Sequence, residues 1–264
     1  MLTAANNQCK VILLSVKYNI MREMTNRVSF LMNIGFMVLN NATFIIQWLL
    51  LFSLKTDIGG YSLKDVMVLW GLAAGTYGFS HIFFQSSYML PDLIMNGKLD
   101  SFLVQPKNVL LSVISSGSSI SAIGDVIYGY LIIGIFNFSL QSLLLFTYFS
   151  IVGALILTAF AVVTGSISFW LVRGDMVADT FNSIMINFST YPDGIFKGVV
   201  RLILYTIVPV GLTVYLPVKI ILHFNFLSML MVTGFAVFII LLAFIVFYQG
   251  LKRYSSSNLM SARI

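Results

Sequence analysis

Five apolar stretches, each longer than 20 residues, constrain the fold of this chain more than any other feature. A transmembrane helix needs roughly 20 consecutive apolar residues to cross about 30 Å of hydrocarbon. Only 9% of the residues are charged and 59% are hydrophobic, whereas a soluble domain carries roughly 25% charged residues. The sequence therefore excludes a soluble enzyme and predicts an all-α, polytopic membrane protein. The stretches are Val28–Leu54, Val66–Leu90, Val109–Phe136, Leu143–Leu171 and Phe226–Tyr248.

A weaker apolar region precedes the last stretch. Met176–Tyr191 is a marginal span because polar residues lie along it, and Val199–Leu222 is apolar but interrupted by Pro209 and Pro217. Proline removes a backbone donor and breaks a helix. We expect Met176–Tyr191 to cross the membrane and residues 194–222 to enter and leave on the outer side. The prediction is six transmembrane helices, with this broken re-entrant hairpin before the last one.

The positions of the fifteen Lys and Arg residues predict the orientation. Six crossings place ten of these cations on one face and five on the other, and cytoplasmic segments carry the excess of Lys and Arg. Both termini are therefore expected in the cytoplasm. The net charge of +6 is dispersed without a basic run, so no nucleic-acid partner is expected. The ten are Lys10, Lys17, Arg22, Arg27, Lys98, Lys107, Arg173, Lys252, Arg253 and Arg263, and the five are Lys55, Lys64, Lys197, Arg201 and Lys219.

Two segments on the predicted cytoplasmic face stand out from the single transmembrane domain of residues 1–264. Residues 10–27 carry four cations and are expected to form an interfacial helix that lies on the bilayer. Residues 91–108 form the longest predicted loop, which has room for one or two helical turns beneath the membrane.

The sequence lacks the motifs of common catalytic and nucleotide-binding sites. The Gly-Lys dipeptide at residues 97–98 is followed by Leu and lacks the upstream glycine, so ATP is not expected to bind this chain through a P-loop. The motifs H-E-x-x-H, C-x-x-C and G-x-S-x-G are also absent. Cys9 is alone, and His81 and His223 are far apart in sequence, so neither a metal site nor a cofactor is expected.

Several polar or small residues lie inside the predicted spans. An ionised carboxylate at the bilayer centre costs about 2.5–3.5 kcal/mol, so Asp125 should face protein, water or a partner. Asp125 is either a point on a substrate path or dimer seam, or a structural acid hydrogen-bonded near Tyr128. His81 is either part of the path or a helix-packing histidine. Gly75 and Ser116 lie in stretches of small residues that favour close helix packing, either within the bundle or along a moving seam.

Residues 94–106 read Ile-Met-Asn-Gly-Lys-Leu-Asp-Ser-Phe-Leu-Val-Gln-Pro, which is similar to the I-x-x-G-x-L-D-x-x-L-x-x-P loop of one protein family. On this motif the chain resembles the permease subunits of bacterial type-2 ABC exporters, in a six-span subgroup that was formerly uncharacterised. The resemblance extends from about Val16 to Tyr248. It also includes, in the expected order, Ser168-Phe169-Trp170, Tyr191-Pro192, Val208-Pro209 and Tyr215-Leu216-Pro217.

The resemblance implies a transmembrane half in the bacterial cell membrane that pairs with a second permease, identical or related. The pair would sit on two copies of a separate ATPase subunit, which binds the ATP and Mg. In that family the N-terminal surface helix and the first cytoplasmic loop contact the ATPase, and the hairpin closes the outer end of the path. Carried over to this chain, the ATPase-coupling residues are Lys17, Arg22, Asp92, Asn96, Gly97, Lys98, Leu99, Asp100 and Pro106, and the hairpin residues are Pro209 and Pro217.

Three residues of this loop have expected roles that follow from their chemistry. Gly97 can adopt a turn conformation at no steric cost. Leu99 is expected to offer an apolar knob to the ATPase. Asp100 is expected either to cap the next helical turn or to pair with the ATPase.

These observations predict the permease subunit of an ATP-driven exporter that has no catalytic residue of its own. The cargo class is left open among a lipid, a peptide and a drug-like amphiphile. Lys197, Arg201 and Lys219 give the hairpin a positive charge that suits an anionic or amphiphilic cargo, or cations that snorkel to the interface. An ATP-independent channel or ion-coupled secondary transporter is the alternative, although paired intramembrane acids are missing. An intramembrane enzyme is a third class, and the sequence offers no nucleophile–base pair for it.

Overall fold

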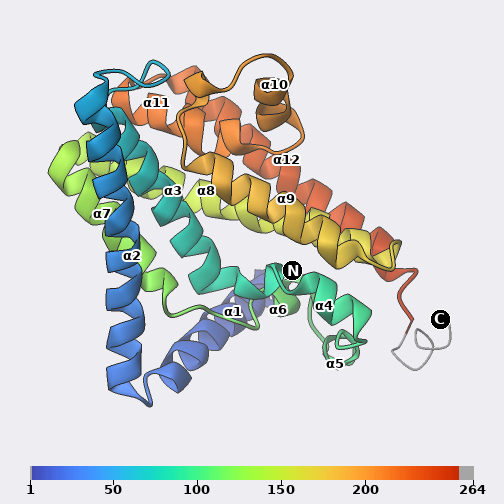
Figure 1. The fold of residues 1–264 in the computed structure, drawn as a ribbon. Helices are drawn as coiled ribbons and strands as arrows, with labels where there is room; N and C mark the ends of the chain where they lie inside the picture. The colour runs from blue at the N-terminus through green and yellow to red at the C-terminus, as the bar shows by residue number, and fades with distance from the viewer. Residues whose placement is uncertain (1, 256–264) are drawn as a thin grey trace.

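The structure is a computed structural model that describes residues 2–255. Within this range the chain is helical and has no β-strand, as the sequence predicts (Figure 1). Arg263, one of the cations counted above, lies outside the described residues. The longer helices are α1 (Leu2–Glu23), α2 (Arg27–Leu54), α3 (Leu63–Phe84), α7 (Ala122–Phe136), α8 (Leu140–Ser166), α9 (Gly174–Ser189) and α12 (Phe226–Leu251). The shorter ones are α4 (Leu90–Met95), α5 (Asp100–Leu103), α6 (Val109–Ile114), α10 (Gly198–Thr206) and α11 (Leu216–Leu222), with 3₁₀ turns η1 (Gln85–Ser87), η2 (Ile167–Phe169) and η3 (Asp193–Ile195) and the π-turn η4 (Gly211–Tyr215).

The helix lengths confirm a multi-pass membrane chain but do not confirm six spans. Among residues 2–255, four helical segments are long and apolar enough to cross a membrane, or five if the bent pair Gly198–Thr206 and Gly211–Leu222 counts as one span. The four are α2, α3 extended to Met95, α8 extended to Phe169, and α12. The two other predicted spans form shorter helices, α7 with 15 residues and α9 with 16 residues.

The predicted third span, Val109–Phe136, is wrong as one continuous helix. Helix α6 ends at Ile114, residues 115–121 are not helical, and α7 begins at Ala122. Serine hydroxyls compete with the helix for backbone groups. The Ser115 hydroxyl donates to the Leu111 carbonyl at 2.7 Å, and the Ser119 backbone N–H donates to the His81 carbonyl of α3 at 2.9 Å.

Helix α3 lies at the centre of the bundle, packed between α7 and α8 (Figure 1). Small residues allow this close approach. A Cβ atom at Gly75 would lie 2.9 Å from Phe146 Cζ and from Ser150 Oγ, both on α8. A Cβ atom at Gly78 would lie 2.6 Å from Val126 Cγ2 on α7. Of the two alternatives for Gly75, the structure therefore shows packing within the bundle.

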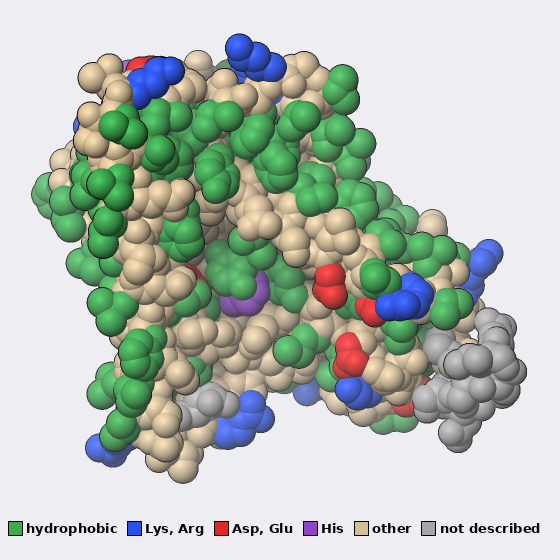
Figure 2. Space-filling view, in the orientation of Figure 1, with side chains coloured by type: hydrophobic (Ala, Val, Ile, Leu, Met, Phe, Trp, Pro, Cys, Tyr) green, Lys and Arg blue, Asp and Glu red, His purple; other side chains and the backbone are tan. Residues whose placement is uncertain are grey.

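The outer helices expose most of their apolar surface. Helix α2 buries only Asn41 and Trp48 of its 28 residues, and large apolar side chains are exposed along both α2 and α12. In the face shown in Figure 2, Lys and Arg side chains gather at the top and along the lower and right-hand parts, and hydrophobic or uncharged side chains cover the area between. This pattern is typical of a protein with a lipid-facing band.

The N-terminal helix differs in its bounds from the predicted interfacial helix of residues 10–27. Helix α1 ends at Glu23, and Arg27 is already the first residue of α2, which Asn26 caps by accepting a hydrogen bond from the Ser29 N–H at 3.2 Å. Lys10, Lys17 and Arg22 are exposed, whereas Val16 is buried. The exposed surface of the helix thus carries these cations together with large apolar side chains such as Leu13 and Tyr18.

Candidate functional site

The segment from α4 to α5 forms a compact turn whose shape depends on Gly97. Asn96 ends α4, and Gly97 has a φ of +68°, in the region that favours glycine. The Lys98 N–H donates to the Leu93 carbonyl at 2.9 Å, and the Gly97 N–H donates to the Ile94 carbonyl at 3.3 Å. These two bonds form a Schellman motif, which closes the helix and reverses the chain. The predicted turn at Gly97 is confirmed.

Asp92 organises the exposed surface of this turn. Its Oδ2 atom pairs with Lys98 Nζ at 2.7 Å, and its Oδ1 atom accepts a hydrogen bond from the Asn96 side chain. The side chains of Asp92 and Lys98 are 54% and 57% exposed, so both remain accessible to a partner. Pro106 is also exposed, in the turn that follows α5. Three of the predicted coupling residues, Asp92, Asn96 and Lys98, thus form one polar patch.

Leu99 does not form the predicted apolar knob. Its side chain is fully buried, and it belongs to the same core cluster as Leu90 and Ile94 of α4. A fully buried leucine stabilises a fold by about 1.5–3 kcal/mol through removal of apolar surface from water. Leu99 therefore attaches the turn to the bundle. The prediction from the sequence was wrong because a single apolar residue in a short loop does not reveal whether its side chain points toward the bundle or away from it.

Asp100 lies beside the C-terminal end of the last helix. It is the first residue of α5 and lies in the first turn of that helix, while Leu99 occupies the N-cap position. Burial, together with the neighbouring Asp100 carboxylate, raises the pKa of Tyr254 to about 12. The Tyr254 ring also packs on Phe169, with a centroid distance of 6.2 Å. We call residues 92–100 the coupling turn, after the role predicted for them, and this turn is thus in contact with the residues that follow α12.

Phe169, in the Ser-Phe-Trp sequence that carried part of the resemblance, connects two helices at this end. Its ring centroid lies 5.7 Å from that of Phe247 on α12. A Cβ atom at Gly250 would lie 2.2 Å from Phe169 Cδ2, so no larger residue fits there without displacing the ring. Phe169 therefore fixes the end of α8 against the end of α12.

Helix α1 contacts residues 116–118 through the side chain of Asn19. Asn19 Nδ2 donates to the Ser116 carbonyl at 3.1 Å and to Ser118 Oγ at 3.4 Å. The predicted coupling residues Lys17 and Arg22 lie on this helix. Ser116, predicted on the path or seam, lies in the non-helical segment between α6 and α7, where its hydroxyl contacts the Val113 carbonyl at 2.7 Å and Ser86 Oγ at 2.9 Å.

The two titratable residues singled out within the spans occupy different surroundings. His81 is stacked between Tyr77 and Tyr88, with centroid distances of 3.8 and 4.3 Å, which fits a helix-packing histidine. Asp125 is 2% exposed, and its Oδ1 atom accepts a hydrogen bond from Asn41 Nδ2 of α2 at 2.6 Å. Its hydrogen-bond partner is Asn41, which fits the alternative of a hydrogen-bonded structural acid, whereas the Tyr128 hydroxyl makes no hydrogen bond among the described residues.

The predicted hairpin contains one bend rather than two breaks. The segments Gly198–Thr206 and Gly211–Leu222 meet at 74°, and Pro209 lies in the turn between them. Pro217 instead lies at the start of α11, which continues directly from η4. Proline is tolerated in a first helical turn because its missing N–H has no partner there.

A buried carboxylate that the sequence did not single out connects this hairpin to the rest of the chain. The side chain of Asp193 is 3% exposed. Its Oδ1 atom accepts a hydrogen bond from the Tyr61 hydroxyl at 2.8 Å, and its Oδ2 atom accepts from Tyr205 at 2.9 Å, Lys219 at 2.8 Å and Arg201 at 3.3 Å. We call these five residues the Asp193 cluster.

The Asp193 cluster explains the positive charge of the hairpin. Burial raises the pKa of Asp193, but hydrogen bonds from Lys219, Tyr61 and Tyr205 outweigh it, and the pKa lies below its usual value. Arg201 and Lys219 thus neutralise an internal acid, whereas Lys197 is not a member of this cluster. One feature of the sequence could have identified this cluster: a single acid, Asp193, precedes three cations in an otherwise apolar region.

Comparison with protein families gives one match, to the ABC-2 family transporter protein, over residues 38–258. The chain belongs to this family. It is thus a permease of the ABC-2 type, a transport protein of the membrane rather than an enzyme. Curated proteins and solved structures each gave no match. The matched range contains both the coupling turn and the Asp193 cluster, whereas α1 lies outside it.

Proposed function

We propose that this ABC-2 permease is the transmembrane half of an ATP-driven exporter, powered by a separate ATPase subunit that binds ATP and Mg. The polar patch of Asp92, Asn96 and Lys98 is the observation that carries the proposal. It is exposed, it is held in a defined shape by the Gly97 turn, and Leu99 attaches it to the bundle. A partner that presses on this patch moves the bundle rather than a loose loop.

The mechanism is a switch between two arrangements of the helices. ATP-driven closure of two ATPase subunits pushes on the coupling turn and on α1, and the bundle responds as a two-state element. The Asp193 cluster holds the hairpin at the outer end during the resting state. Two permeases, identical or related, form the path between them, because one small bundle leaves little room for a sealed route. The cargo is a lipid, a peptide or a drug-like amphiphile.

The proposal places both termini and residues 91–108 on the cytoplasmic face of a bacterial cell membrane. The bias of Lys and Arg supports this orientation. In a Cys9-free background, an impermeant thiol reagent applied to intact cells should label a cysteine at Thr56 and not one at Asn96. Labelling of the Asn96 site with Thr56 silent would reverse the topology.

The decisive test is purification of the tagged chain from its native membrane in mild detergent, followed by measurement of ATP hydrolysis. An ATPase should co-purify, and Lys98→Glu should weaken its association while the permease still inserts. Lys107→Glu, on the same exposed loop but outside the polar patch, is the matched control and should retain the ATPase. Absence of an ATPase from the purified chain would overturn the proposal.

One observation supports the alternative function of an ATP-independent channel or ion-coupled transporter. Asp125 is a buried acid whose Oδ2 atom has no hydrogen-bond partner among the described residues. The purified chain in liposomes without an ATPase would then pass a cargo or an ion, and Asp125→Asn would abolish that flux. We place this function second, because no group of three metal-ligating or acidic residues accompanies Asp125 in the described part of the chain.

A further inference from the structure

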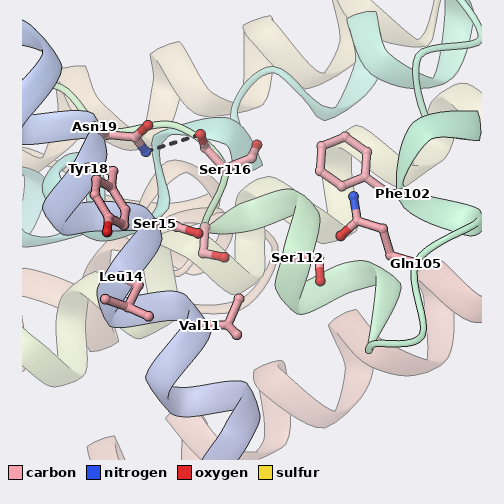
Figure 3. A pocket seen from close by; sticks show the side chains of 10 residues that line it. Val11, Leu14, Ser15, Tyr18, Asn19, Phe102, Gln105, Ser112 and Ser116 are labelled. Atoms are coloured by element: carbon pink, nitrogen blue, oxygen red, sulfur yellow. Dashed lines mark hydrogen bonds between the residues drawn. The ribbon is translucent and has the colours of Figure 1, made fainter.

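A cavity of about 420 Å³ lies between α1, α5 and the segment from α6 to residue 116 (Figure 3). Small-molecule sites are typically clefts of about 300–1,000 Å³. Side chains of α1 form one wall, Phe102 and Gln105 form the opposite wall, and Ser112 lies between them (Figure 3). The space is therefore large enough to hold part of a ligand.

The lining of this cavity is uncharged and contains both apolar and polar side chains. None of its ten residues is acidic or basic. Val11, Leu14 and Phe102 offer apolar surface, and the serines, Asn19 and Gln105 offer hydroxyl and amide groups. Burying a charged headgroup against such a lining would leave the charge unpaired, which is unfavourable. A neutral ligand with hydroxyl groups and an apolar tail matches both parts.

One polar atom beside the cavity lacks a partner. The Ser112 Oγ atom is buried and makes no hydrogen bond within the described part of the chain. Buried polar groups in native proteins nearly always have a partner. The Gln105 side chain donates to the Ser101 carbonyl at 3.0 Å through its nitrogen, and its carbonyl oxygen can accept a bond from a hydroxyl.

We propose that this cavity is a binding site for a neutral, hydroxyl-bearing lipid, of the acylglycerol type, that enters from the cytoplasmic leaflet. The interfacial position that the sequence predicts for α1 would give the leaflet direct access to the wall that α1 forms. Binding of the lipid bridges α1 and the residues that follow the coupling turn, and so stabilises the arrangement in which both lie together. The binding step is independent of the proposed function, whereas its effect on ATP hydrolysis rests on it.

The test uses the purified permease alone, in nanodiscs of phosphatidylcholine that contain a trace of diacylglycerol with a photoreactive acyl chain. Illumination should label peptides that contain residues 11–19 and 102–116. Val11→Trp fills the cavity and should lower the labelling about tenfold, a change of 1.4 kcal/mol in binding. Leu13→Trp adds the same ring to an exposed position of α1 outside the lining, and should leave the labelling unchanged.

Competition identifies the headgroup. Unlabelled diacylglycerol should compete, and phosphatidylglycerol, which carries a negative charge, should not. Equal labelling of Val11→Trp and Leu13→Trp, or equal competition by phosphatidylglycerol, would overturn the site. Ser15→Leu, which fills the same space from the next turn, replaces Val11→Trp if that variant does not elute as a single folded species.

A second measurement separates this inference from the proposed function. If an ATPase co-purifies, diacylglycerol should change its rate of hydrolysis in the wild type and not in Val11→Trp. Loss of labelling with the ATPase still bound would refute the lipid site alone. Retained labelling in a chain that binds no ATPase would refute the exporter proposal alone.

Discussion

The two ends of the molecule are held together by opposite kinds of interaction. At the end that we propose to face outward, a buried carboxylate, Asp193, receives hydrogen bonds from four side chains that come from the 55–62 loop, α10 and α11. At the end that we propose to face the cytoplasm, the charged pair Asp92–Lys98 is exposed and is separated by only six positions, while the apolar side chain of Leu99 makes the buried contact.

This difference indicates how each end responds to a perturbation. Removing one partner from a buried charged cluster leaves the others uncompensated, whereas an exposed pair contributes about 0–1 kcal/mol. The outer end therefore depends on charge and pH, and the cytoplasmic turn depends on packing. The exposed charges of the turn remain accessible, as the proposed contact with an ATPase requires.

The largest effect is expected at Leu99. Leu99→Ala should lower the free energy of unfolding by about 2–5 kcal/mol, because it leaves a cavity where a fully buried side chain packed. Thermal unfolding in detergent measures the loss, and limited proteolysis should show cleavage near residue 97. Leu103→Ala, in the adjacent α5 and 40% exposed, is the control and should cost much less. Equal effects of the two changes would contradict the anchoring role of Leu99.

A smaller loss is expected at Asp193. Asp193→Ala should lower the free energy of unfolding by about 2–3 kcal/mol. Breaking a fully buried ion pair costs about 3–5 kcal/mol, and the expected loss is smaller here because Lys219 and Arg201 are about half exposed. Proteolysis should then cut the hairpin and spare the coupling turn. Asp57→Ala, at an exposed acid of the same face, provides the comparison. A hairpin as resistant as in the wild type would show that the Asp193 cluster does not hold it.

Acid should remove the same contribution without a mutation. Because the pKa of Asp193 is lower in the folded chain, its ionised form stabilises the fold above the pKa of the unfolded carboxyl, about 3.9. This stabilisation is lost as the pH falls through the folded pKa. The difference in unfolding temperature between the wild type and Asp193→Asn should be constant from pH 5 to 8 and shrink below about pH 4. A difference at pH 3 that is as large as the one at pH 7 would contradict this assignment.

The smallest effect on stability is expected at Lys98. Lys98→Ala should change the free energy of unfolding by less than about 0.5 kcal/mol, because the pair with Asp92 is exposed. Its association with the ATPase should nevertheless weaken, which a pull-down at increasing salt measures. A double change of Asp92→Lys and Lys98→Asp tests whether the pair or the individual charges matter. If stability falls as much as in Asp193→Ala, the comparison of the two ends fails.

The sequence predicted those parts of the fold that depend on local pattern. Apolar length identified α2, α8 and α12, and the glycine at position 97 identified the turn. The break at residues 115–121 escaped prediction because serines are tolerated in membrane helices and only the contact with α3 shows that they leave the helix.

The remaining errors concern contacts between distant residues. Tyr61 and Asp193 are separated by 132 positions, and Asn41 and Asp125 by 84, so no sequence window contains both members of either pair. The orientation of Leu99 depends likewise on where the bundle lies relative to its turn. These contacts and orientations depend on tertiary packing, which cannot be predicted from the local pattern of a single sequence.

Helix α12 connects the two ends of the molecule and can act as a lever between them. It begins four residues after the end of α11, and Tyr254, three residues after its own end, lies against the coupling turn. Its 26 residues make it about 39 Å long, so a tilt about its outer end displaces its inner end by about 0.7 Å per degree. A rotation of five degrees would therefore carry Tyr254 away from Asp100, while the hairpin at the pivot scarcely moved.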